Sequence, residues 1–171
     1  LIWVTMFNPS QGVLNYFLSF LGFKPLVWLG HPRTVLPSLI LMDIWKWTPF
    51  MVLITHAGLQ SLPFTPFEAA RIDGASRWQL FRFITLPLLR PTIAVALIFR
   101  TMDSLKTFDT IYVMTEGGPN NASEILNIYV FQTGFKYFHM GYASALAVIL
   151  VVFVFAVNLF LIRLRERSWS Y

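Results

Sequence analysis

The sequence has 171 residues, of which 56% are hydrophobic and 12% charged, and its mean hydropathy is +0.62. A soluble domain typically carries about 25% charged residues, so this chain has roughly half the usual supply. Its formal net charge is +5, but the Lys and Arg residues sit at the ends of apolar stretches, which indicates a membrane protein and argues against a nucleic-acid partner. Because the sequence contains no cysteine, disulfides and thiolate metal sites are excluded.

The first residues have the character of a helix end. The chain opens on Leu1-Ile2-Trp3-Val4 without an initiating Met or a basic region, unlike a signal peptide. Residues 1–7 span only ~10 Å of a ~30 Å bilayer core, so we expect the end of a transmembrane helix and a longer parent polypeptide. Residues 8–23 alternate turn residues with large apolar ones, which is typical of a short helix lying on the membrane interface.

Three stretches are long enough to cross a bilayer, at about 34–60, 87–115 and 142–162. The first contains Asp43, Lys46 and Pro49, so we expect one of its faces to pack against protein, with Asp43 and Lys46 as a local pair. The third is interrupted only by Asn158. The sequence therefore predicts an all-α, polytopic membrane protein in which residues 1–171 form a single transmembrane domain.

Positive charges in the loops predict the orientation. On one side they lie in loop 61–90 and in the C-terminal tail, and they are Arg71, Arg77, Arg82, Arg90, Arg163, Arg165 and Arg167. The other side contains Lys24, Arg33 and Lys136. We therefore expect loop 61–90 and the C-terminus in the cytoplasm, and residues 8–33 and 116–140 outside.

The predicted cytoplasmic loop 61–90 contains helix start and stop signals. Thr65 and Glu68 have the spacing of a capping box, with Pro66 at the first helical position. Gly74 can end this short helix in the left-handed conformation. The loop is thus expected to contain a short helix that ends at a glycine.

A second helix is expected directly after the first. Ser76 and Gln79 have the spacing of another capping box, and Pro87 and Pro91 predict that the chain turns before it enters the membrane. The expected structure is a helix–glycine–helix elbow. Taken alone, such an elbow fits a stable interfacial loop as well as a docking site.

The loop resembles the EAA loop of binding-protein-dependent ABC importers. The residues that carry the resemblance are Glu68-Ala69-Ala70, Asp73-Gly74-Ala75, Ile84, Leu86-Pro87 and Pro91. In that family the short helix is a coupling helix, which sits in a groove of the ATPase subunit and transmits its closure to the membrane helices. The resemblance implies that Glu68, Ala69, Ala70, Asp73 and Gly74 couple this chain to an ATPase.

A second stretch is similar to the sugar-importer branch of the same family, the MalF-like permeases. It reads Phe108-Asp109-Thr110-Ile111-Tyr112-Val113, followed by Thr115-Glu116-Gly117-Gly118-Pro119. The resemblance implies a permease of a bacterial inner membrane that moves a sugar or polyol. Such permeases usually have about six helices, and three complete ones are expected here.

The resemblance also implies partners. These are a second permease subunit, a dimer of ABC ATPase subunits and an external sugar-binding protein. The sequence contains no Walker pattern or other glycine-rich phosphate loop, so ATP and Mg²⁺ are expected on the ATPase. For this chain itself we expect no cofactor, no metal site and no enzymatic activity.

Four charged residues follow one another within the second predicted span: Arg100, Asp103, Lys106 and Asp109. Each unpaired charge near mid-membrane costs at least ~2.5–3.5 kcal/mol on insertion scales, so neighbouring members are expected to pair, Arg100 with Asp103 and Asp103 with Lys106. The row fits a self-neutralising ladder against a partner helix. It also fits a polar wall of the sugar path, in which Asp109 and Tyr112 hydrogen-bond sugar hydroxyls.

Three other functions fit parts of the sequence. One is the same kind of importer with a different solute, such as an amino acid or phosphate. Another is a membrane-embedded enzyme that uses Arg100, Asp103 and Asp109 as an acid–base cluster. The third is a passive channel, which would conduct solute without an ATPase.

Overall fold

The computed structural model describes the backbone of residues 2–167 and the side chains of residues 2–163. Within this part of the chain every regular element is helical, which confirms the all-α prediction. The predictions made for Leu1 and the C-terminal end lie outside the described residues, and so do the side chains of Arg165 and Arg167.

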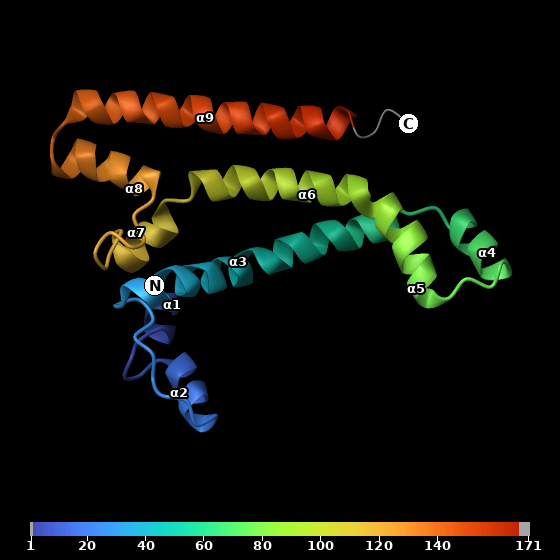
Figure 1. Ribbon diagram of the computed structural model, residues 1–171, viewed down its shortest axis with the longest axis horizontal. Coiled ribbons are helices and arrows are strands. Elements are labelled where there is room, and N and C mark those ends of the chain that lie inside the picture. Colours follow the sequence, from blue (N-terminus) through green and yellow to red (C-terminus); the bar gives the residue numbers. More distant parts are fainter. Residues whose placement is uncertain (1, 168–171) are drawn as a thin grey trace. The chain divides into compact units, whose positions relative to one another are not determined.

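Three helices correspond to the three predicted membrane spans (Figure 1). They are α3 (Pro32–Gln60), α6 (Leu86–Lys106) and α9 (Met140–Arg167). By length and composition, Pro32–Gln60, Arg77–Lys106 and Met140–Arg163 can each cross a bilayer. Their apolar side chains face outward along most of their length, as expected for helices that contact lipid or other membrane helices.

The second span differs from the helix predicted over residues 87–115. Helix α6 ends at Lys106, and a separate helix, α7 (Asp109–Thr115), follows. The side-chain amide of Asn127 donates to the carbonyls of Leu105 at 3.2 Å and Thr107 at 3.0 Å. In a continuous helix these carbonyls would accept the N–H groups four residues later. A contact with a residue 20 positions away therefore ends the helix, which local sequence patterns do not reveal.

The expected turn ahead of the membrane is also absent. Helix α5 (Arg77–Leu80), the π-helical turn η1 (Phe81–Thr85) and α6 follow without interruption, with Pro87 and Pro91 inside α6. Proline lacks an N–H and its ring crowds the carbonyl of the preceding turn. The wider π turn directly before Pro87 is a common way to accommodate such a defect in a membrane helix.

The chain divides into two compact units. Unit one comprises Leu1–Lys46 with Ser104–Ala156, and unit two comprises Trp47–Asp103 with Val157–Tyr171. Each of the three long helices contributes residues to both units.

Unit one begins with the short helices α1 (Ile2–Met6) and α2 (Val13–Phe20), and aromatic contacts join α1 to α3 and to the segment that precedes α3. The ring of Phe7, which is almost completely buried, lies 5.4 Å from Trp3 and 5.6 Å from Trp28. Trp3 also meets Trp45 of α3 edge to face at 5.2 Å. Such aromatic pairs stabilise a fold beyond their buried area.

Unit one also contains α7, α8 (Leu126–Phe131) and the π turn η2 (Gln132–Lys136). Helix α7 ends after Thr115, where Glu116 and Gly117 adopt positive φ angles. The Thr115 and Ser123 hydroxyls lie 2.8 Å apart, and Ser123 donates to the Gly118 carbonyl at 2.6 Å. These bonds hold the corner between α7 and α8.

In unit two, α3 and α6 approach closely at a glycine. A Cβ atom on Gly58 would lie 2.6 Å from the Cγ2 atom of Thr92. Small residues at such contacts let membrane helices pack backbone to backbone. The side chain of Ala96, one turn further along α6, is fully buried.

Candidate coupling elbow and substrate path

The elbow predicted in loop 61–90 is formed by α4 (Thr65–Ile72) and α5, at the right of Figure 1. The predicted capping box of Thr65 and Glu68 was wrong, because Thr65 is already helical and Phe64 takes the N-cap position without a side-chain bond. Pro66 lies in the first turn, where backbone N–H groups have no acceptor within the helix, so proline loses no helical hydrogen bond there. Proline, rather than a capping hydroxyl, marks the start of α4.

The end of α4 and the start of α5 agree with the sequence prediction. Gly74 has a φ of 78°, and its N–H donates to the Arg71 carbonyl at 3.1 Å. The N–H of Ala75 donates to the Ala70 carbonyl at 2.9 Å, which completes a Schellman motif. Both bonds of the predicted Ser76–Gln79 capping box are present. Backbone and side-chain bonds thus define the bend between the two helices.

Helix α4 has two distinct faces. Phe64, Phe67, Glu68 and Arg71 line a groove of about 590 Å³ together with His56, Leu59, Gln60, Leu62 and Thr85. Ala69 and Ile72 do not line this groove and form the open face of α4, where Ile72, one turn after Glu68, is 86% exposed. The structure therefore separates the predicted coupling residues: Glu68 faces the groove, whereas Ala69 lies on the open face.

The sequence analysis missed Ile72 as a candidate coupling residue. Ile72 is the most exposed of the large apolar side chains among the described residues, and Phe64, at the start of α4, is similarly exposed at 80%. The available signal was the spacing of Ala69 and Ile72, which places them on one side of a helix that begins at Pro66. Ala70 is half-buried, and Asp73 and Gly74 are exposed at the bend.

Two of the five predicted substrate-path residues pair with each other in unit two. Arg100 Nη1 lies 3.6 Å from Asp103 Oδ2, as predicted. The guanidinium carbon of Arg100 also lies 5.2 Å from the centroid of the Trp47 ring. An ion pair combined with a cation–π contact makes a charge tolerable in an apolar environment. This geometry is the one expected of a charge ladder, and it is compatible with a polar wall.

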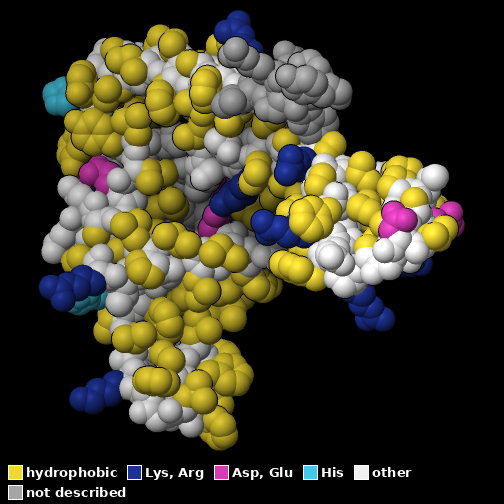
Figure 2. Space-filling model, turned by 45° about the vertical axis from the view of Figure 1, so that its right-hand side comes forward, with side chains coloured by type: hydrophobic (Ala, Val, Ile, Leu, Met, Phe, Trp, Pro, Cys, Tyr) yellow, Lys and Arg dark blue, Asp and Glu magenta, His cyan; other side chains and the backbone are white. Residues whose placement is uncertain are grey.

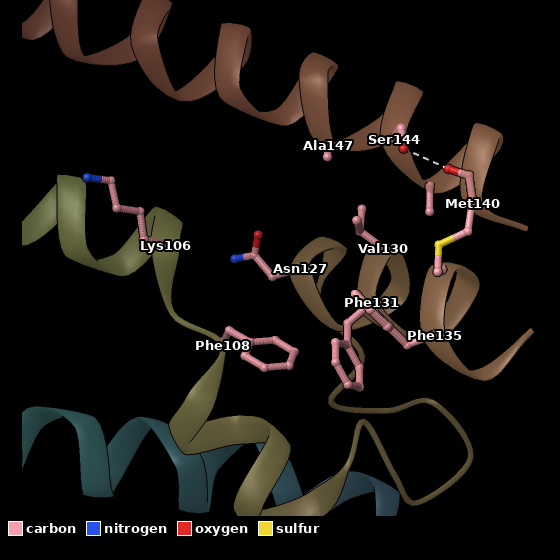
Figure 3. A pocket seen from close by; sticks show the side chains of 11 residues that line it. Lys106, Phe108, Asn127, Val130, Phe131, Phe135, Met140, Ser144 and Ala147 are labelled. Atoms are coloured by element: carbon pink, nitrogen blue, oxygen red, sulfur yellow. Dashed lines mark hydrogen bonds between the residues drawn. The ribbon is translucent and has the colours of Figure 1, made fainter. Parts of the chain in front are cut away.

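The other three predicted path residues belong to unit one. Lys106 lines a hollow of about 420 Å³ with Phe108, Asn127, Phe131, Phe135 and Ser144, among others (Figure 3). Three phenylalanines form one wall, and Ser144 and Ala147 of α9 form the facing wall. Tyr112 is stacked on Phe108 at 5.1 Å and meets Phe131 edge to face at 5.0 Å. Asp109 is exposed on the first turn of α7.

A smaller hollow in unit one contains polar residues that the sequence analysis did not select as path residues. Its volume is about 210 Å³, and its polar lining consists of Asp43, Ser104, Thr107 and Thr110. The three hydroxyl residues recur at every third position along the chain, a signal that was available in the sequence. Hydroxyls and a carboxylate are suitable hydrogen-bond partners for sugar hydroxyls. Among the described residues, no group of three or more His, Asp or Glu side chains could hold a metal ion.

Comparisons with known proteins place these features in a family. The family model for the binding-protein-dependent transport system inner membrane component matches residues 1–168. The trehalose/maltose transport system permease protein MalF of Thermococcus litoralis is 43% identical over 95% of this chain and 54% of its own length. The sulfoquinovosyl glycerol transport system permease protein SmoG of Agrobacterium fabrum is 43% identical over 97% of this chain and 55% of its own length.

The fold is shared with a solved transporter. A chain of a bacterial ABC transporter involved in the import of the acidic polysaccharide alginate superposes with a TM-score of 0.87 and 30% identity, covering 99% of this chain and 59% of that one. The chain thus spans about half the length of the curated relatives it matches. The predicted permease fold is confirmed. The protein belongs to the family of binding-protein-dependent transport system inner membrane components.

Proposed function

We propose that this chain contributes the membrane pathway of an ATP-driven importer that moves a sugar or polyol across a bacterial inner membrane. The observation that carries the proposal is the exposed, well-capped elbow of α4 and α5 on a membrane protein of this family. The sugar named for two permease relatives and the alginate named for the structural neighbour support a carbohydrate as the solute. A non-sugar solute remains the second candidate, because the family as a whole is defined by transport rather than by sugars.

In this proposal the elbow transmits ATPase closure to the membrane helices. The apolar open face of α4, with Ala69 and Ile72, would enter a groove of the ATPase, because burying Ile72 there removes an otherwise exposed apolar side chain from water. The groove face, with Glu68 and Arg71, is shared with α3 residues such as His56 and Gln60. A push on α4 would therefore reach α3 directly, and alternating access of the solute cavity would follow.

The partners are proposed on the same basis. ATP and Mg²⁺ would be bound by two ABC ATPase subunits in the cytoplasm, where the elbow and the C-terminus would also lie. A second permease subunit would complete the pathway. A binding protein would deliver the solute from outside, and a structure of the alginate transporter in complex with its substrate-bound periplasmic protein supports this partner.

The solute would pass along α6 and α7, which carry the predicted path residues. Arg100, Asp103, Lys106, Asp109 and Tyr112 are the predicted path residues, and the hydroxyls of Ser104, Thr107 and Thr110 add hydrogen-bonding capacity. The aromatic wall of Phe108 and Phe131 offers flat apolar surface against which a sugar ring can stack.

The proposal is tested by co-purification of an ATPase with the full-length subunit in detergent. We expect an ATPase subunit to co-purify with the wild type, and to be lost or to stop responding to solute in Ile72→Glu and Glu68→Lys. Ile72→Glu places a charge in the proposed apolar contact, and Glu68→Lys reverses a charge beside Arg71. A suitable control is Glu116→Lys, the same charge reversal at an exposed position after α7, which should leave ATPase binding unchanged.

Recovery of no ATPase with the wild type from native membranes would refute the importer proposal and favour the passive channel or the enzyme. Recovery that falls with Glu68→Lys but not with Ile72→Glu would keep the importer and move the docking contact to the groove face of α4. Full recovery with both variants would remove the elbow from the coupling mechanism.

A further inference from the structure

Helix α2 presents one continuous apolar face that no other described part of the chain covers. Val13, Tyr16, Phe17 and Phe20 follow the i, i+3, i+4, i+7 pattern of a single helix face, and all four are exposed, Phe20 by 83%. The opposite face contains Asn15, which is 5% exposed. The aromatic side chains of α2 thus point outward, and the amide of Asn15 points inward.

The inward face holds α2 in a fixed orientation. The Asn15 amide nitrogen donates to the carbonyls of Pro9 and Leu26, each at 2.9 Å. The Asn15 amide oxygen accepts from the Leu26 N–H at 3.0 Å and from the Trp28 indole N–H at 2.9 Å. A single buried side chain therefore joins the segment before α2 to the segment after it.

The same segment is bonded to the first turns of α3. The hydroxyl of Thr34 donates to the Val27 carbonyl, and that of Ser38 donates to the Trp28 carbonyl at 3.1 Å. Since α3 is a membrane span that begins at Pro32, these bonds hold α2 at the level where the span leaves the membrane. Figure 1 shows α2 lying across the direction of the first turns of α3, which is how a helix in the membrane plane would run.

The charges around α2 agree with a lipid surface. Helix α2 has no charged residue, Lys24 and Arg33 follow it, and no acidic residue precedes Asp43. Hydrophobic side chains gather over α2 in the lowest part of Figure 2, without an acidic one beside them. A reversible contact with a soluble protein would be expected to mix polar and apolar groups, whereas an aromatic stripe next to basic residues is the pattern of an interfacial helix.

We propose that α2 is an interfacial anchor, with Val13, Tyr16, Phe17 and Phe20 immersed in the lipid interface on the side of the membrane where α3 begins. Interfacial helices of this kind sink about 5–10 Å into the boundary between headgroups and acyl chains. At that depth Lys24 can reach the lipid phosphates. The anchor would fix the outer end of α3 through the Asn15 bonds.

Fluorescence quenching in proteoliposomes tests this placement. These 171 residues contain no cysteine, so, with any cysteine elsewhere in the subunit replaced, Phe20→Cys and Tyr16→Cys each provide one label position on the stripe. The matched control is Ser19→Cys, which is exposed in the same helix but lies off the stripe. The labelled full-length subunit is reconstituted into vesicles of phosphatidylethanolamine and phosphatidylglycerol, with either a nitroxide lipid or aqueous iodide as quencher.

We expect the nitroxide lipid to quench labels at positions 16 and 20 several-fold more strongly than the label at position 19, with the reverse order for iodide. Strong iodide quenching at all three positions would overturn the proposal, because the stripe would then face water. Protection of positions 16 and 20 from both quenchers would also overturn it, because protein would then cover the stripe.

Discussion

Asn15 makes four hydrogen bonds with one buried side chain, and no apolar residue can replace them. Substitution by alanine leaves the Leu26 N–H, the Trp28 indole N–H and two carbonyls without this partner. Each buried polar group left unsatisfied costs about 1–3 kcal/mol. We therefore predict that Asn15→Ala opens the segment between α2 and α3 locally, with proteolytic cleavage in residues 21–31 faster by one to two orders of magnitude.

Limited proteolysis of the purified subunit measures this effect. Gln11→Ala serves as the control, because Gln11 lies in the same loop with an exposed side chain, and its cleavage rate should match the wild type. Equal rates for Asn15→Ala and the wild type would mean that the aromatic contacts of Phe7 and Trp28 hold the segment without Asn15.

Gly74 and Gly141 both lie at helix boundaries, but they differ in backbone conformation. A Cβ atom would meet nothing within 4 Å at either Gly74 or Gly141, but only Gly74 has a positive φ. A non-glycine residue in the left-handed conformation costs roughly 1–2 kcal/mol. We predict that Gly74→Ala weakens the Schellman motif, so that hydrogen exchange at the Ala75 amide is about tenfold faster.

Gly141→Ala is the matched change, and the opposite sign is expected there. Gly141 lies in the first turn of α9 with helical neighbours, where alanine is favoured over glycine by roughly 0.5–1 kcal/mol. Exchange at the start of α9 should therefore slow or stay the same, while exchange in the elbow stays unchanged. Faster exchange of equal size in both variants would point to a general loss of stability rather than to the conformation of Gly74.

Across the whole molecule, sequence reasoning succeeded where the cause is local. Length and hydropathy predicted the three spans, and the spacing of Ser76 and Gln79 predicted the second cap of the elbow. It failed where a distant residue decides the structure. Asn127 ends α6 by donating to the carbonyls of Leu105 and Thr107, which precede it by 22 and 20 positions and share no local sequence pattern with it.

The predicted substrate path shows the same limit. Arg100 and Asp103 are three residues apart on one helix, so their ion pair follows from helix geometry. The hollow that contains Lys106 also requires Phe131 from α8 and Ser144 from α9, and no periodicity in the sequence brings these three together. The three-residue spacing of Ser104, Thr107 and Thr110 could have been recognised in the sequence. No sequence pattern, however, indicates that Asp43 of α3 lines the same hollow.

The distribution of positive charge predicts the orientation of the whole chain, which can be measured directly. Arg71, Arg77, Arg82 and Arg90 lie in or beside the elbow, and loops rich in Lys and Arg remain on the cytoplasmic side. We predict that Ser76→Cys, at the exposed N-cap of α5, reacts with a membrane-impermeant maleimide only after the cells are opened. Ser10→Cys, exposed before α2, should react in intact spheroplasts. Since the sequence contains no cysteine, the unmodified chain gives the background.

Labelling of Ser76→Cys from outside would mean that the topology is inverted and that the elbow lies where no cytoplasmic ATPase could reach it. The predicted labelling pattern instead leaves the elbow accessible for the docking proposed above.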